Sequence, residues 1–159
     1  HPRVNILQPG TGVGGHCIAV DPWFIVSEDP ENSRIIKTAR EINNSKPEWV
    51  IDKITAKADS LNTKKVACLG LAFKPDIDDL RESPAVRVVE SLIEQGYEVS
   101  CVEPNINDYK KYNLIDIKKA IAEFDVIALL VKHKEFTSNI ILTELESKGT
   151  LDFCGTFSK

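Results

Sequence analysis

Short apolar runs alternate with helix-patterned segments from about residue 62 onward, and this alternation constrains the fold more than any other feature of the sequence. The apolar runs have the length and composition of buried strands, and the segments between them carry apolar residues at helical spacing. Strands that alternate with helices pair in parallel and are covered by helices on both faces. We therefore predict an α/β fold with a Rossmann-like open parallel sheet. The strands are predicted at residues 65–71, 97–102, 126–131 and 150–153, and the helices at residues 85–96, 117–124 and 141–145.

The first part of the chain follows a different pattern. Residues 1–30 are rich in glycine and proline and are predicted to be mainly loop. Residues 33–61 have helical spacing, but the stretch Ser-Lys-Pro-Glu at residues 45–48 fits either the start of a second helix or a kink in one long helix. We divide the chain into a loop and helix region, residues 1–61, and a sheet domain, residues 62–159. Because the sequence starts at His1 and contains no methionine, we expect a piece of a longer protein.

Composition narrows the range of partners and settings. The 159 residues carry a net charge of -4 and no block of basic residues, so nucleic acid is not an expected partner. The apolar runs are far shorter than the ~20 residues that a membrane span needs, and the N-terminus lacks a signal-peptide pattern, which indicates a cytoplasmic setting. The four cysteines are well separated and form no Cys-x-x-Cys pair, so we predict neither a metal site nor a disulfide framework.

The glycine-rich stretch at residues 10–15, Gly-Thr-Gly-Val-Gly-Gly, fits the G-x-G-x-x-G dinucleotide fingerprint by letter. That fingerprint needs a strand before it and a helix that opens at its last glycine. Residues 16–22 are instead β-biased and end at Pro22, so we reject a dinucleotide turn. Two interpretations stay open. The glycines either let backbone N–H groups approach an anionic ligand closely or form a structural turn.

Cys17 follows directly after this glycine loop, and Asp21 lies four residues further on. A thiol beside a run of exposed amides can be stabilised as a thiolate and act as a nucleophile, while a nearby carboxylate orients water or a proton carrier. His16 is a weaker candidate for the base than Asp21. Cys68 and Cys101 lie within apolar strands and are predicted to be buried and inert.

A second polar segment, residues 70–84, follows the first predicted strand and runs into a helix for which Ser83 is the expected N-cap. Ligands of open parallel sheets bind beyond the carboxyl ends of the strands, which here carry residues 70–75, 103–105 and 132–133. Lys74 and Arg81 could bind phosphates. Alternatively, the four acidic residues of the segment neutralise both cations, and the segment is only a solvated loop.

Two long motifs in this order resemble the nucleotide-sugar 6-dehydrogenase family. They are residues 8–22, Gln-Pro-Gly-Thr-Gly-Val-Gly-Gly-His-Cys-Ile-Ala-Val-Asp-Pro, and the pair Gly-Leu-Ala-Phe-Lys-Pro (70–75) and Asp-Asp-Leu-Arg-Glu-Ser (78–83). The resemblance implies an oxidoreductase that converts the C6 alcohol of a UDP-sugar to a carboxylate with two NAD and one water. It also implies an N-terminal NAD domain, a helical centre that dimerises and a C-terminal UDP-sugar domain, of which this chain is similar to the last two.

The resemblance further implies a homodimer through residues 33–61, with NAD bound mainly by the domain that this sequence does not cover, so the fragment is not expected to turn over by itself. At the matching motif positions, Cys17 would be the nucleophile that forms a thiohemiacetal and then a thioester, and Asp21 would position the hydrolytic water or stabilise developing charge. The remaining matched positions are His1, Arg3, Gly14, Phe73 and Lys74, which would contact the UDP-sugar, and Arg81, which would face NAD.

The sequence around the nucleophile indicates a branch of the family. UDP-glucose enzymes tend to carry Cys-Phe-Pro-Lys-Asp, whereas Cys-Ile-Ala-Val-Asp-Pro favours the branch that oxidises UDP-N-acetyl-D-mannosamine for polysaccharide biosynthesis. Oxidation of UDP-glucose or UDP-N-acetylglucosamine is the alternative within the family. The alternative from another class is a stand-alone nucleotide-binding module in which Cys17 is only a redox-labile thiol. Cys154 departs from the pattern because related enzymes usually have a basic residue there.

Overall fold

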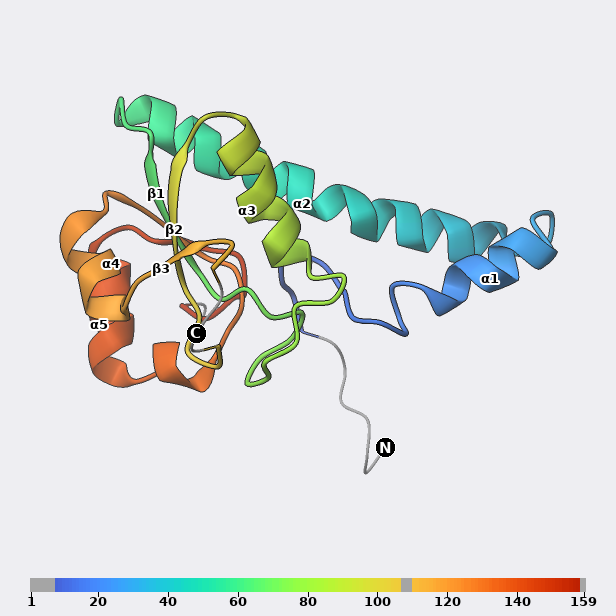
Figure 1. The fold of residues 1–159 in the computed structure, drawn as a ribbon. Helices are drawn as coiled ribbons and strands as arrows, with labels where there is room; N and C mark the ends of the chain where they lie inside the picture. The colour runs from blue at the N-terminus through green and yellow to red at the C-terminus, as the bar shows by residue number, and fades with distance from the viewer. Residues whose placement is uncertain (1–7, 107–109, 158–159) are drawn as a thin grey trace.

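A computed structural model describes residues 8–106 and 110–157, and its centre is a five-stranded sheet in which all neighbouring strands are parallel (Figure 1). The strand order is β3-β2-β1-β4-β5. The predicted open parallel α/β sheet is therefore confirmed, although the two-residue strand β3 has no signal in the sequence. The strands are β1 (Lys65–Leu69), β2 (Glu98–Val102), β3 (Asn113–Leu114), β4 (Val126–Leu129) and β5 (Leu151–Asp152).

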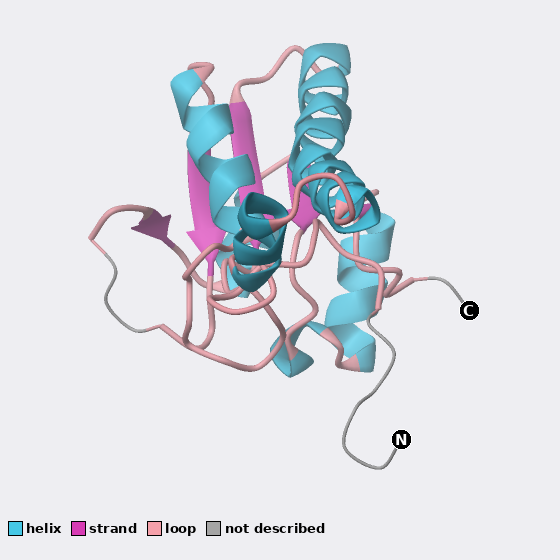
Figure 2. Cartoon of the chain, turned by 90° about the vertical axis from the view of Figure 1, so that its right-hand side faces the viewer, coloured by secondary structure: helices cyan, strands magenta, loops and turns pink. Residues whose placement is uncertain are grey.

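Helices cover both faces of the sheet (Figures 1 and 2). Helices α2 and α3 pack on one face, where they meet Val66 and Cys68 of β1, and α4 and α5 pack on the other, where they meet Ala67 and Leu69. Because both faces are covered, alternate residues of a strand are equally buried, which explains the continuous apolar runs. The helices are α1 (Asp21–Glu28), α2 (Arg34–Ser60), α3 (Pro84–Glu94), α4 (Ile117–Glu123) and α5 (Asn139–Ser147), with a short 3-10 helix η1 (Lys134–Phe136).

Helix α2 is one continuous helix that contains Pro47, which decides between the two interpretations that the sequence left open. Proline removes one backbone hydrogen bond, but the helix continues through it. The second half of α2 packs against the sheet through Val50, Ile54 and Ala58. The first half extends away from the sheet together with α1 (Figure 1). The long helix therefore links the sheet to the segment that carries the glycine loop.

Helix α1 is an element that the sequence analysis did not predict within residues 1–30, whose other described residues are loop or turn as expected. Pro22 was interpreted as the end of a β-biased segment, but it lies in the first turn of α1, where its missing N–H costs no helical hydrogen bond. Ser83 occupies the predicted N-cap position of α3, but its hydroxyl donates to the Leu71 carbonyl at 2.6 Å and does not cap the helix. Among the described residues, no helix combines the length and the apolar character that a membrane crossing requires.

Candidate functional site

A cavity of about 480 Å³ opens at the carboxyl end of the sheet, between the ends of β1 and β4. Its lining comes from residues 8–14, which include most of the glycine loop, and from Ile18. The rest comes from residues 73–75 after β1, from residues 130–132 after β4, and from Cys154 after β5. The order in which strands are added to the sheet reverses between β1 and β4. From β1 the chain adds β2 and β3 on one side of the sheet, and it then adds β4 and β5 on the other side of β1. The cavity therefore lies at the switch point where open α/β sheets bind their ligands.

Lys74 and Lys132 are the charged side chains among the described residues that line this cavity. Both are cations, and neither forms an ion pair with another described residue. The Nζ atom of Lys74 lies 5.7 Å from the centre of the Phe73 ring. Most of the remaining lining is glycine, proline or aliphatic. A ligand with an anionic group and a flat or apolar part would fit this combination of charge and surface.

Two glycines allow the glycine loop to approach the segment between β1 and α3. A Cβ at Gly14 would lie 2.1 Å from the Glu82 carbonyl oxygen, and a Cβ at Gly15 would lie 2.8 Å from the Phe73 ring. Gly15 also has a φ of 93°, a conformation that other residues rarely adopt. The loop is thus both a packing element and part of the cavity wall. The close packing supports the structural interpretation of the glycines, and their approach to an anionic ligand stays a prediction.

Asn43 on α2 anchors the glycine loop from the other side. Its Oδ1 accepts a hydrogen bond from the Val13 N–H at 2.8 Å, and its Nδ2 donates to the Val13 carbonyl at 3.0 Å. The guanidinium of Arg40 donates to the same carbonyl at 3.3 Å. The sequence analysis missed Asn43, because a contact across thirty residues leaves no local pattern.

Cys17 is exposed and lies one turn before α1, where its carbonyl accepts the N–H groups of Val20 and Asp21 at 2.9 and 2.8 Å. Its sulfur interacts electrostatically with Arg81. The Arg81 side chain donates to both carboxylate oxygens of Asp79, with a shortest distance of 2.6 Å, and this contact lowers the pKa of Asp79 to about 2. The structure therefore brings Cys17 and Arg81 together, with Arg81 held by a carboxylate.

The other predicted site residues are distributed as follows. Gly14, Phe73 and Lys74 line the cavity. Asp21 begins α1 and is exposed, and within the described part of the chain its carboxylate forms no hydrogen bond or ion pair. His1 and Arg3 lie outside the described residues.

Cys154 lies on the cavity wall, and burial raises the pKa of its thiol to about 12. Its sulfur lies 3.6 Å from the Leu129 carbonyl oxygen, and the Lys132 charge acts on it electrostatically. Cys154 therefore offers the cavity a neutral group, and Lys132 places a cation nearby. The thiols of Cys68 and Cys101 are also buried, as predicted, and burial raises the pKa of each.

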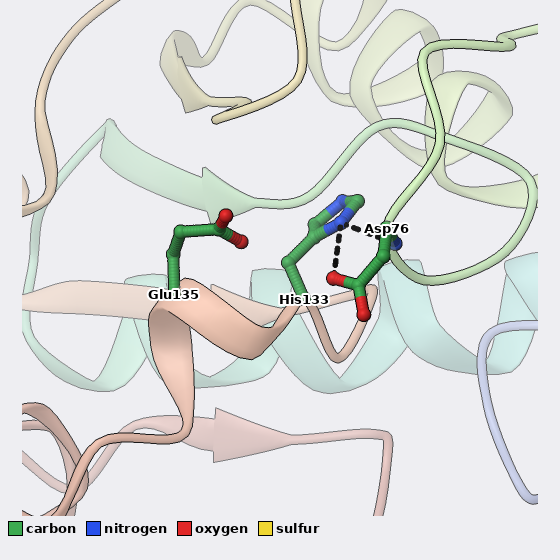
Figure 3. A group of neighbouring side chains, drawn as sticks. All are labelled: Asp76, His133 and Glu135. Carbon is green, nitrogen blue, oxygen red and sulfur yellow. Dashed lines mark hydrogen bonds and ion pairs between the residues drawn. The ribbon is translucent and has the colours of Figure 1, made fainter.

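Asp76, His133 and Glu135 form a group whose oxygen and nitrogen atoms are close enough to hold a metal ion (Figure 3). The group already has other partners. The Nδ1 atom of His133 accepts the Asp76 N–H at 3.0 Å, and an Asp76 carboxylate oxygen accepts the Lys134 N–H at 2.9 Å. A metal would have to displace the Asp76 N–H from the imidazole lone pair, so we assign no metal to this group.

Comparisons with known proteins identify the class to which this fold and site correspond. Residues 67–158 match the UDP-glucose/GDP-mannose dehydrogenase family, UDP binding domain, and residues 1–45 match the central domain of the same family. The chain belongs to this family.

Particular relatives point to one branch. The chain is 52% identical over 162 residues to UDP-N-acetyl-D-mannosamine dehydrogenase of Campylobacter jejuni, covering 97% of this chain and 38% of the relative. It is 54% identical to the protein of that name from Escherichia coli K12, covering 86% of this chain and 36% of the relative. It is 45% identical to an NDP-N-acetyl-D-galactosaminuronic acid dehydrogenase of Ralstonia nicotianae, covering 99% of this chain and 38% of the relative. The chain thus spans well under half the length of these relatives.

Solved structures agree with the sequence comparison. UDP-N-acetyl-mannosamine dehydrogenase from Staphylococcus aureus superposes with a TM-score of 0.79 at 38% identity, covering 100% of this chain and 38% of that one. A UDP-D-ManNAc dehydrogenase from Pyrococcus horikoshii superposes with a TM-score of 0.78 at 32% identity, covering 100% of this chain and 39% of that one. The sheet and its helices are therefore those of the UDP-sugar dehydrogenases.

Proposed function

We propose that this chain carries the UDP-sugar-binding part and the nucleophile of an NAD-dependent UDP-N-acetyl-D-mannosamine 6-dehydrogenase. The observation that carries the proposal is the cavity at the switch point, which combines Lys74, Lys132 and Phe73 with the glycine loop that leads to Cys17. The names of the relatives at 52% and 54% identity support the choice of sugar.

The diphosphate and the apolar parts of the ligand would use different residues of the cavity lining. Lys74 and Lys132 attract the diphosphate, because they carry the charge on the described lining and have no carboxylate partner there. Phe73 and the wall at residues 130–131 offer apolar surface to the base or the sugar. Gly14 is proposed as a contact of the UDP-sugar because it lines the cavity. His1 and Arg3 are proposed as further UDP-sugar contacts.

Cys17 would perform the covalent step. Its thiolate adds to the C6 carbonyl of the aldehyde intermediate, which forms a carbon–sulfur bond and gives a thiohemiacetal once the oxygen takes a proton. Loss of a hydride from C6 to the acceptor, together with loss of the hydroxyl proton to solvent, gives a thioester. Water then adds to the acyl carbon, the carbon–sulfur bond breaks, and the Cys17 thiolate leaves as the carboxylate product forms. Asp21 is proposed to orient this water or to stabilise the charge that develops.

NAD supplies the hydride acceptor for both oxidations. Neither the glycine loop nor the turn after β1 offers a dinucleotide cradle, because α1 begins only at Asp21 and the N–H groups of Leu71 and Ala72 donate to Glu103. We therefore propose that NAD binds mainly through a domain outside this sequence, with Arg81 as the contact from this chain. For the same reason, the chain by itself is not expected to turn over.

The arm formed by α1 and the first half of α2 would form the homodimer. It exposes large apolar side chains, among them Phe24 at 65%, Ile35 at 85% and Ile42 at 66%. Exposed apolar side chains along one element are typical of a protein interface. We propose that residues 1–61 act as the catalytic loop and dimerisation region, that residues 62–159 form the UDP-sugar-binding domain, and that the protein is cytoplasmic.

A chimera tests the proposed reaction. Residues 1–159 are joined behind the preceding part of the Campylobacter jejuni relative, and NADH is measured with UDP-N-acetylmannosamine, UDP-N-acetylglucosamine and UDP-glucose in parallel. Two NADH per UDP-N-acetylmannosamine, lost in Cys17→Ala, are expected. A preference for one of the other sugars would refute the assigned substrate. Because the first oxidation precedes the attack of Cys17, one NADH per sugar in Cys17→Ala agrees with the account. Two NADH per sugar in that variant would refute the nucleophile.

A further inference from the structure

Two ionisable side chains at the carboxyl end of the sheet are buried and do not line the cavity. Glu103 follows β2 and is 6% exposed, and His133 follows β4 and is fully buried. The Nε2 atom of His133 lies 3.1 Å from Oε2 of Glu103. Such a pair is costly to bury unless all of its polar atoms find partners, so the remaining contacts of both side chains indicate what the pair does.

Glu103 holds the start of the segment that follows β1. Its Oε2 accepts the N–H groups of Leu71 and Ala72 at 2.7 and 3.1 Å, and its Oε1 accepts the Asn105 N–H at 3.1 Å. Burial would raise the pKa of Glu103, but the hydrogen bonds from His133 and from these N–H groups keep the pKa below its usual value. Glu103 therefore stays a carboxylate. It accepts hydrogen bonds from the N–H groups that, in a Rossmann turn, would donate to a phosphate.

His133 holds the other end of the same segment. Its Nδ1 accepts the Asp76 N–H at 3.0 Å (Figure 3). Because Nδ1 is an acceptor, the ring proton lies on Nε2 and is directed at Glu103. Asp76 has a φ of 62°, a left-handed conformation that is uncommon outside glycine. Its N–H and its carboxylate are both bound, to His133 and to the Lys134 N–H, and these bonds hold it there.

The segment between these two anchors is short, and it carries Phe73 and Lys74, the side chains that face the cavity. A third contact, from the Ser83 hydroxyl to the Leu71 carbonyl at 2.6 Å, fixes its first residue from the α3 side. Phe73 is also tied to the segment before α3, since its N–H donates to the Asp79 carbonyl at 3.1 Å. The position of Lys74 therefore depends on buried groups that do not touch the ligand.

We propose that Glu103 and His133 are positioning residues that clamp both ends of residues 71–76, so that Lys74 meets the diphosphate of the nucleotide sugar. The inference rests on the proposed function, since it concerns the same cavity. It also explains why the diphosphate needs the lysines, because the N–H groups after β1 already donate to Glu103 and are not available to a phosphate.

A double-mutant cycle tests the clamp, with UDP as the ligand and calorimetric affinity as the readout. In His133→Gln, the longer side chain can still donate to Glu103 but no longer accepts the Asp76 N–H. We expect UDP to bind about tenfold more weakly, as for the loss of one well-placed hydrogen bond. Lys74→Gln should weaken UDP binding by a similar factor. The double variant should bind UDP as Lys74→Gln alone does, because a misplaced lysine and a missing lysine contribute equally little to UDP binding.

His133→Asn is the conservative control. Its side-chain oxygen replaces Nδ1 as the acceptor for Asp76, but its shorter side chain no longer donates to Glu103. UDP should therefore bind more tightly than to His133→Gln and no more tightly than to the unaltered chain. Lys118→Gln, on the exposed side of α4, controls for the loss of one positive charge. Independent, multiplying effects of His133→Gln and Lys74→Gln, or an unchanged affinity in His133→Gln, would overturn the proposal.

Amide hydrogen exchange on the unaltered chain tests the same point if His133→Gln does not fold. The N–H groups of Leu71, Ala72 and Asp76 should be protected although they lie in a loop, and exchange at the rate of an open loop would overturn the clamp. Failure of the unaltered chain to bind UDP would instead refute the proposed function, and the exchange measurement would still decide whether the pair holds the segment.

Discussion

Gly14→Ala is the substitution whose effect follows most directly from the geometry of the glycine loop. Its new Cβ would lie 2.1 Å from the Glu82 carbonyl oxygen and 2.7 Å from Cδ of Pro84. Real Cβ atoms essentially never approach within 3.0 Å of another heavy atom, so the loop and the start of α3 must separate by about 1 Å. The nearest obstacle is backbone, which cannot rotate out of the way.

Forced overpacking of this kind costs about 1–3 kcal/mol. For a chain of this size, each kcal/mol corresponds to about 2–4 °C in Tm, so we expect Gly14→Ala to melt roughly 2–12 °C lower. UDP affinity should also fall, because Gly14 lines the cavity. Thermal unfolding followed by circular dichroism measures the first effect, and calorimetry measures the second.

Gly10→Ala is the matched control, because it makes the same chemical change in the same loop. A Cβ at Gly10 would have no heavy atom within 4 Å, so its Tm should stay within about 1 °C of the unaltered chain. Equal melting temperatures for Gly14→Ala and Gly10→Ala would refute the argument that close approach requires glycine at position 14.

Three further predictions follow from individual contacts. Asn43→Ala removes two hydrogen bonds to Val13 and should lower the free energy of unfolding by about 2 kcal/mol, or the Tm by roughly 4–8 °C. The control Asn139→Ala, on the exposed start of α5, should change the Tm little. Equal melting temperatures of the two variants would contradict the role of Asn43 as an anchor. The pKa of Asp79 is lowered to about 2, so its stabilising contact with Arg81 is complete above about pH 4 and is lost as the pH falls toward 2. In Arg81→Gln, NMR titration should find this pKa raised toward its ordinary 3.8 but still below it, because the backbone N–H of residue 81 still donates to the carboxylate. An unchanged pKa would exclude the Arg81 side chain as the cause. A thiol reagent should label Cys17 alone in the folded chain and all four cysteines in denaturant, and native labelling that persists in Cys17→Ala would contradict the described burial.

The sequence is a good guide to the sheet because parallel strands are buried on both faces. β1, β2 and β4 each appear as an apolar run, and the structure confirms all three within two residues. Strand β3 is only Asn113–Leu114, which is too short and too polar to leave a pattern.

Helix α1 escaped prediction for a different reason. None of its residues is buried, so it has no apolar stripe for periodicity to detect. A proline fits most easily in the first turn of a helix, where Pro22 lies, but the sequence alone does not show whether a helix follows it. Pro47 posed the same ambiguity, and tertiary packing of Val50 and Ile54 against the sheet settled it as one helix.

The candidate site was predictable where a motif carried it and unpredictable where long-range contacts did. The motif residues Phe73 and Lys74 line the cavity. Glu103 and His133 lie at strand ends, where ligands are expected, but they bind each other and the loop after β1. No local sequence pattern predicts these contacts, because each of them joins segments about thirty residues apart.

The central claim is that the cavity between β1 and β4 binds the diphosphate of a nucleotide sugar through Lys74 and Lys132. Isothermal titration calorimetry of the chain with UDP tests it most directly. The account predicts saturable binding that weakens about tenfold in Lys74→Gln and in Lys132→Gln but not in Lys118→Gln. No binding of UDP, or binding that is indifferent to both cavity lysines, would contradict it.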